Sequence, residues 1–200
     1  TANLVGFGTQ FVDYDNDGDL DIFVTNGEVQ DKIGRESGQS IYPQRDQLYR
    51  KNADNTYTEV SFDAGDYFSH QYVGRGVAFG DYDNDGDTDI LVTNCNQKPV
   101  LLRNDGGNRK NWLSIKLVGQ KSNRSAIGAR VLLTCDNRVQ LAEVRSTGSY
   151  LSSHDRRIIF GLDQNYHVHK LDIFWPSGIQ QTRQNLPVNQ LLKIVESLEE

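Results

Sequence analysis

The chain has 200 residues, of which 36% are hydrophobic and 10% aromatic, and its formal net charge is -6. This length and composition suit one large or two small folded domains and differ from those of a disordered chain. No apolar run reaches the roughly 18 residues that a membrane-spanning helix needs, and a sequence pI of about 5.2 opposes binding to a phosphate backbone. We therefore expect neither a membrane span nor a nucleic-acid partner.

Charge divides the chain into two unequal halves. Residues 1–110 contain 19 acidic and 10 basic side chains, a net of -9, whereas residues 111–200 contain 8 and 11, a net of +3. Clustered aspartates in the acidic half favour a cation as its partner. We predict two regions, residues 1–107 and residues 108–200.

Methionine is absent, and Thr1 stands at the first position. This indicates either a removed leader or a chain that is part of something longer, and it favours an extracellular or cell-surface protein. Cys95 and Cys135 are the only cysteines, too few for a disulfide framework or a zinc site. They form either one disulfide in an oxidising compartment or two buried thiols.

The first half contains an internal repeat. The segment FVDYDNDGDLDIFVTN at residues 11–26 recurs as FGDYDNDGDTDILVTN at residues 79–94, an offset of 68. A shorter echo relates residues 48–50 (LYR) to residues 101–103 (LLR) at an offset of 53. The first copy therefore carries a 15-residue insertion within residues 27–47, which predicts an exposed loop.

The expected secondary structure is all-β. Short apolar runs such as residues 22–24 and 90–92 are punctuated by Gly, Asn and Asp. In the second half, the strand candidates are residues 112–117, 129–133, 139–144, 157–160, 170–175 and 191–195. Several of them alternate as half-buried strands do, so we expect a β-sandwich there. The last run, up to Leu198, equally fits a helix.

Each repeat carries an acidic loop of the form Asp-x-Asp-x-Asp-Gly-x-x-Asp. Five carboxylates within nine residues repel one another, and a hard divalent cation offsets that repulsion. Alternation places the first, third and fifth carboxylates around one point, and the glycine permits a sharp turn. An all-oxygen, highly charged donor set favours calcium over magnesium, which keeps its waters. We therefore expect about two calcium ions per chain.

Ten aspartates are the predicted metal ligands. The first loop offers the side chains of Asp13, Asp15, Asp17 and Asp21 and the carbonyl of Asp19; the second offers the side chains of Asp81, Asp83, Asp85 and Asp89 and the carbonyl of Asp87. The alternative is that each loop is only a solvated acidic turn, since Asp and Asn are common in turns. The presence of two nearly identical copies argues against this alternative. An EF-hand needs flanking helices and a Glu at position 12, where Val24 and Val92 stand. A phosphotransferase with a nucleophilic Asp would need an α/β pattern that the chain lacks.

Residues 74–87 (GRGVAFGDYDNDGD) resemble the FG-GAP or VCBS type of repeat, which includes the calcium-binding blades of integrin α-chain propellers. Residues 47–52 and 57–60 resemble the outer part of such a blade, so the resemblance covers roughly residues 4–107. It implies two four-stranded β-propeller-type blades with an ion in the loop between two strands. A propeller usually closes with about four to eight blades.

The second half resembles the ASPIC/UnbV domain, which follows such repeats in secreted proteins of the cartilage acidic protein type. The residues that carry this resemblance are 104–108 (NDGGN), 111–113 (NWL), 127–131 (IGARV), 160–162 (FGL) and 175–178 (WPSG). The family implies no established activity. The fold class expected overall is two blades with calcium loops followed by a β-sandwich-like domain.

The histidines and serines of the second half also invite a catalytic or metal interpretation. His167 and His169 would share one face of a strand and could form a zinc pair, but no third ligand is evident, so we favour surface histidines. Ser149, Ser152 and Ser153 precede His154, yet catalytic triads assemble from distant segments. From these residues we predict no enzymatic activity.

The sequence as a whole favours a secreted, calcium-binding structural or interaction protein without enzymatic activity. Calcium would rigidify the blades, which would form a homo-oligomer or filament through exposed edges, or adhere to a protein or glycan. One alternative is a lectin-like module that uses Trp112 or Trp175. Another is an extracellular hydrolase, which would need a pocket of carboxylates that are not calcium ligands.

Overall fold

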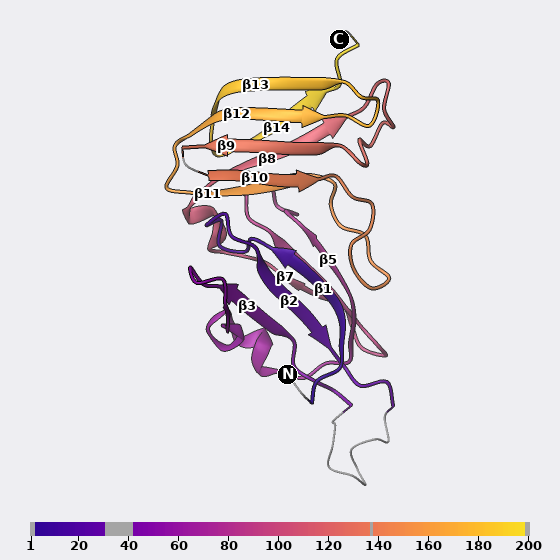
Figure 1. Ribbon diagram of the computed structural model, residues 1–200. Coiled ribbons are helices and arrows are strands. Elements are labelled where there is room, and N and C mark those ends of the chain that lie inside the picture. The colour runs from indigo at the N-terminus through magenta and orange to yellow at the C-terminus, as the bar shows by residue number, and fades with distance from the viewer. Residues whose placement is uncertain (1–2, 31–41, 137, 199–200) are drawn as a thin grey trace.

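The computed structural model describes residues 3–30, 42–136 and 138–198. Fourteen strands occupy these described residues, together with three short 3-10 helices, η1 (Ser61–Asp63), η2 (Asp66–Ser69) and η3 (Gly107–Arg109), which confirms the all-β class. Figure 1 shows strands β8 to β14 gathered at one end of the molecule, beyond the sheets of the sequence repeats. No helix in the described part is long and apolar enough to cross a membrane.

Each sequence repeat forms one antiparallel sheet. The first contains β1 (Gly6–Val12), β2 (Asp21–Asn26), β3 (Gln47–Lys51) and β4 (Tyr57–Glu59), in that order. The second contains β5 (Gly74–Gly80), β6 (Asp89–Asn94) and β7 (Val100–Leu102). In both sheets the acidic loop joins the first two strands, so the repeated sequence folds in the same way twice.

The first repeat forms a sheet of four strands, the number expected of a blade, whereas the second sheet has three strands within the described residues. At the offset of 53, β4 would correspond to residues 110–112, which lead into β8 (Asn111–Val118) instead. Leu113, Ile115 and Leu117 of β8 are buried in the C-terminal core. Because these side chains are buried in the C-terminal core, this segment pairs within the sandwich and not with the second sheet.

The two repeat sheets pack face to face around one apolar cluster. Phe23 and Leu48 pair across β2 and β3, and both are buried against the second sheet. The ring of Phe79 on β5 lies edge-on to that of Phe23, with 6.0 Å between centroids. Val77 and Val92 complete the contact and are fully buried. One face of each repeat sheet is thereby covered by the other sheet.

The C-terminal region is a β-sandwich, as predicted. One sheet has the order β10-β9-β12-β13 and the other β11-β8-β14. The remaining bounds are β9 (Arg130–Cys135), β10 (Arg138–Glu143), β11 (Ile158–Asp163), β12 (His167–Phe174), β13 (Gln180–Pro187) and β14 (Gln190–Val195). Leu113 and Ile115 from one sheet and Leu133 and Leu171 from the other share a single buried core. Residues 191–195 form a strand parallel to β8 rather than a helix.

The two cysteines and the insertion loop were also considered from the sequence. Both cysteines are free thiols, so Cys95 and Cys135 are not bridged in this structure. Residues 31–41 of the predicted insertion loop lie outside the described residues, while Gly27 and Pro43 on its two sides form a β-bridge.

Candidate metal centre

The two acidic loops fold with the same internal hydrogen bonds. Asp13 accepts from the N–H of Asp17 through Oδ1 at 3.1 Å and from the N–H of Gly18 through Oδ2 at 2.8 Å. In the second loop the corresponding N–H groups lie 3.1 and 3.2 Å from the two oxygens of Asp81. The carboxylate of the first aspartate in each loop therefore stabilises the turn by accepting hydrogen bonds from two of its backbone N–H groups.

The last aspartate ties each loop to its own sheet. Asp21 accepts from the N–H of Tyr14 at 3.4 Å and from the N–H of Lys51, at the end of β3, at 2.8 Å. Asp89 makes the two equivalent bonds in the second loop, at 3.0 and 2.8 Å. A carboxylate accepts several bonds at once, so both groups retain lone pairs for a cation.

Positive φ angles complete the shared loop conformation. Asn16 and Asn84 have φ of 53° and 63°, and Gly18 and Gly86 have φ of 84° and 97°. Asparagine and glycine are the residues that tolerate this region best. The backbone of the turn thus favours the Asn and the Gly of each loop.

Each loop brings three carboxylates together. One oxygen each from Asp13, Asp15 and Asp21 lies within 4.8 Å of the others, and the second loop gathers Asp81, Asp83 and Asp85 within the same distance. Calcium binds oxygens at about 2.3–2.6 Å, so this separation is what one ion spans. The third carboxylate is thus the ninth loop residue in the first loop and the fifth in the second. Among the described residues, no other group of three or more His, Cys, Asp or Glu side chains has such an arrangement.

The other four predicted ligands are placed differently. Asp17 turns one oxygen to the N–H of Asp19 at 2.7 Å, and Asp89 lies outside the tight cluster of its loop. The side chain of Asp19 faces the basic residues Lys51 and Arg138. Asp87 is fully buried, and its Oδ1 has no hydrogen-bond partner within the described structure.

The protonation behaviour of the loops reflects their crowding. Burial raises the pKa of Asp13 to about 8, with repulsion from Asp17 and Asp15 adding to the effect. Burial likewise raises the pKa of Asp21 and that of Asp87 to about 7. Such carboxylates are costly to ionise without a compensating cation, so the donor set fits a hard metal ion.

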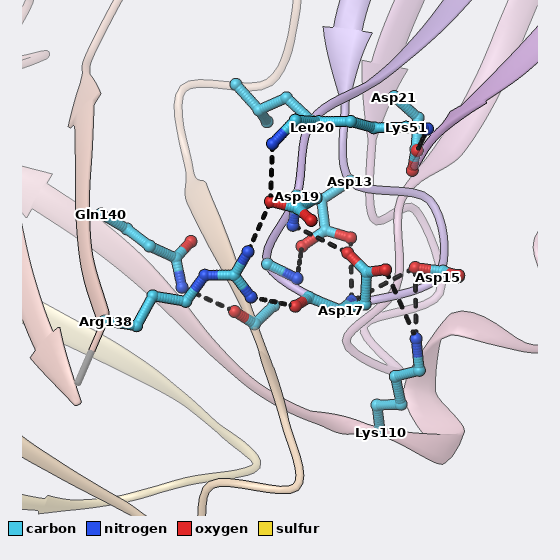
Figure 2. Close-up of polar contacts among 12 residues, drawn as sticks. Asp13, Asp15, Asp17, Asp19, Leu20, Asp21, Lys51, Lys110, Arg138 and Gln140 are labelled. Carbon is cyan, nitrogen blue, oxygen red and sulfur yellow. Dashed lines mark hydrogen bonds and ion pairs between the residues drawn. The ribbon is translucent and has the colours of Figure 1, made fainter. Parts of the chain in front are cut away.

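Basic side chains neutralise much of the first loop (Figure 2). Lys51 Nζ lies 3.0 Å from Asp19, and Lys110 Nζ lies 3.4 Å from Asp15. Arg138 Nη2 lies 2.5 Å from Asp19 Oδ1. Five carboxylates thus face three cations, which leaves a formal charge that one divalent ion would balance.

The C-terminal sandwich supplies part of the first loop's surroundings. Arg138 of β10 donates a second bond from Nη1 to the carbonyl of Asp17, and the N–H of Asp163 donates to the carbonyl of Asn16 at 2.9 Å. Gly161 of β11 lies so close that a Cβ built there would be 2.0 Å from Asp13 Oδ2. The loop is therefore enclosed between the two regions.

The second loop is held by the same region through other residues. Arg157 donates from Nη2 to the carbonyl of Asp81 and from Nη1 to Asn84 Oδ1 at 2.6 Å. Trp112 packs against Gly86, where a Cβ would lie 1.8 Å from its ring. These contacts could not be predicted from the sequence, because no spacing relates Arg157 or Trp112 to the second loop.

The serine and histidine cluster of the sandwich serves to dock one segment on the repeats. Ser149 and Ser152 accept from the N–H groups of Thr9 and Val77, at 2.8 and 3.0 Å, through their hydroxyl oxygens. His154 accepts at Nδ1 from the N–H of Phe79 at 3.3 Å. These bonds cover the free edges of β1 and β5.

His167 and His169 share one face of β12, as predicted, with ring centroids 5.4 Å apart. His169 Nε2 lies 2.9 Å from Asp136 Oδ1, and His167 Nε2 lies 3.3 Å from Asn185 Oδ1. Their partners are thus an acidic and an amide side chain, and they belong to no three-ligand metal cluster among the described residues.

Comparison with known proteins agrees with this architecture. Residues 13–92 match the family model for FG-GAP-like repeats, and residues 119–200 match that for ASPIC and UnbV. The predicted resemblance of the chain to FG-GAP-like repeats followed by an ASPIC/UnbV region is thereby confirmed. The chain is also similar to cartilage acidic protein 1 of Xenopus tropicalis, with 27% identity over 175 residues. The match covers 86% of this chain and 25% of the relative, so the chain spans about a quarter of that protein.

Proposed function

We propose that the chain is an extracellular calcium-binding structural module that binds one calcium ion in each acidic loop. Its role is to present rigid β-sheets for self-assembly or adhesion, without catalysis. The observation that carries the proposal is the shared geometry of the two loops, in which three carboxylate oxygens converge within 4.8 Å. When bound, calcium would supply the positive charge that lets these buried carboxylates ionise.

The loop residues divide the work of holding such an ion. Asp13, Asp15 and Asp21 would hold it in the first loop, and Asp81, Asp83 and Asp85 in the second. The N–H groups that bond to the first aspartate keep the turn closed around them. Because Arg138 and Arg157 reach the same loops from the sandwich, an ordered loop also orders the contact between the two regions.

The extracellular location rests on the matched relative, whose name associates it with cartilage. Extracellular calcium modules function with dissociation constants of about 0.1–1 mM, and we expect the two loops to bind calcium in this range. The two tryptophans considered for glycan stacking are both in protein contacts: Trp175 is buried and Trp112 covers Gly86. The serines near His154 are bonded to backbone groups, which favours a noncatalytic role.

Calorimetric titration of calcium into chelator-stripped protein tests the proposal, with magnesium as the competing ion. We expect about two calcium ions per chain and much weaker magnesium binding. Asp13→Asn and Asp81→Asn should each remove one ion. Asp63→Asn, an exposed acidic position outside both loops, should bind two ions like the parent. A parent protein that binds no calcium would overturn the proposal.

A further inference from the structure

The sequence repeat shows which surface of each sheet is unpartnered. Phe23 and Leu48 of the first repeat pair with each other, and they are 0% and 3% exposed because the second sheet covers them. Their equivalents in the second repeat, at offsets of 68 and 53, are Leu91 and Leu101. These two also pair across β6 and β7, but they are 40% and 48% exposed.

On the other face of each sheet, the second repeat is covered and the first repeat is exposed. Phe79 of the second repeat packs on Phe23 and is 8% exposed. Its equivalent in the first repeat is Phe11, which is 58% exposed. A groove of about 770 Å³ opens beside Phe11 and Leu20, and Val139 and Leu141 of β10 also line it.

The two open faces are thus the separate halves of a contact that the chain already makes once. We infer that a second copy of this chain docks head to tail, with Leu91 and Leu101 of one copy on the Phe11 face of the next. The contact repeats the packing of Phe23 and Leu48 on Phe79 and continues that interface in both directions.

This inference deepens the proposed function, since it names the partner and the surface through which the module acts. It moves the contact from strand edges, where the sequence placed it, to sheet faces. Ser149, Ser152 and His154 already bond to the free edges of β1 and β5, whereas the faces with Phe11 and with Leu91 and Leu101 remain exposed. A head-to-tail contact is heterologous, so it builds a ring if the rotation closes and a filament if it does not.

Sedimentation velocity over a concentration series, in saturating calcium, tests the inference. The parent should associate with increasing concentration. Phe11→Asp alone and Leu91→Asp with Leu101→Asp should each be monomeric, because each variant lacks one half of the contact. An equimolar mixture of the two variants should form a 1:1 dimer and nothing larger, because the intact halves still meet. Leu191→Asp, at an equally exposed position in β14, should associate like the parent.

Two results would overturn the inference. One is a parent that stays monomeric while binding two calcium ions, which leaves the proposed function intact. The other is a Phe11→Asp variant that still dimerises, which indicates a symmetric contact through Leu91 and Leu101. Association that persists in a parent unable to bind calcium would instead sink the proposed function and support the docking surface. The 1:1 dimer of the mixture also shows that both variants fold.

Discussion

Arg138 and Arg157 do the same thing for the two acidic loops: each reaches from the sandwich to donate to a loop carbonyl, Arg138 to that of Asp17 and Arg157 to that of Asp81. Arg138 begins β10, whereas Arg157 stands just before β11, and their targets lie at different loop positions. Two unrelated segments of the sandwich therefore have the same role, because each holds one of the two repeats against the sandwich.

Replacing either arginine should loosen the contact between the regions. For Arg138→Ala and Arg157→Ala we expect the free energy of unfolding to fall by about 1 kcal/mol each, since these bonds are partly exposed and solvent screens their charge. Chemical denaturation of the metal-free protein measures the effect. Arg183→Ala, an exposed arginine whose bond goes to its neighbour Thr182, serves as the control and should change little. Equal losses in all three variants would contradict the assignment.

Lys110 should weaken calcium binding in the first loop, because its ammonium group lies 3.4 Å from Asp15. In an Asp81→Asn background, where the first loop alone binds, Lys110→Gln should tighten calcium binding by about 0.5–1 kcal/mol, or roughly two- to fivefold. Calorimetric titration gives the dissociation constants. Lys98→Gln, an exposed lysine at the far end of β6, should leave them unchanged, and a weaker site in Lys110→Gln would refute the idea.

The metal-free protein should lose stability as the pH rises. Burial raises the pKa of Asp13 to about 8, that of Asp21 to about 7 and that of Asp46 to about 6, all above the ordinary 3.8. The folded chain then holds protons that the unfolded chain has released, so the stabilisation present at about pH 4 disappears through pH 6 to 8. Melting curves in chelator check this. Saturating calcium should flatten the dependence, and a metal-free melting temperature that rises with pH would contradict it.

Glu196 should give the opposite dependence at acid pH. Burial opposes its ionisation, but hydrogen bonds from Ser177, Ser122 and Gln120 outweigh burial and lower the pKa of Glu196 to about 2. Its stabilisation is present above pH 4.5 and is lost as the pH falls toward 2. Glu196→Gln should cost about 2 kcal/mol at neutral pH. The difference from the parent should narrow in acid, and a difference that is constant with pH would show a purely steric effect.

The sequence predicted those parts of the fold whose residues follow a short local rule. The Asp and Gly spacing predicted both loops because positive φ and clustered oxygens depend on neighbouring residues. Alternation predicted β8 to β12 and β14, whose inward side chains are apolar. It missed β13, Gln180–Pro187, a largely exposed and polar strand that pairs with β12.

Long-range relationships were beyond the sequence. Nothing local in Arg138 or Gly161 indicates a loop more than a hundred residues earlier. The repeat offset alone placed a fourth strand of the second sheet at residues 110–112, where the sandwich strand β8 begins instead. Competition between two cores, rather than strand propensity, decided their place.

The close approach of Gly161 to Asp13 has a consequence for how such chains can change over time. Any side chain at position 161 would collide with a carboxylate of the first loop, so the sandwich and the repeats constrain each other's sequence. They are therefore not interchangeable modules. A chimera that joins these repeats to a sandwich from another protein should fail to seat unless it brings a glycine to the same place, and shuffling of the two regions would be restricted to pairs that kept it.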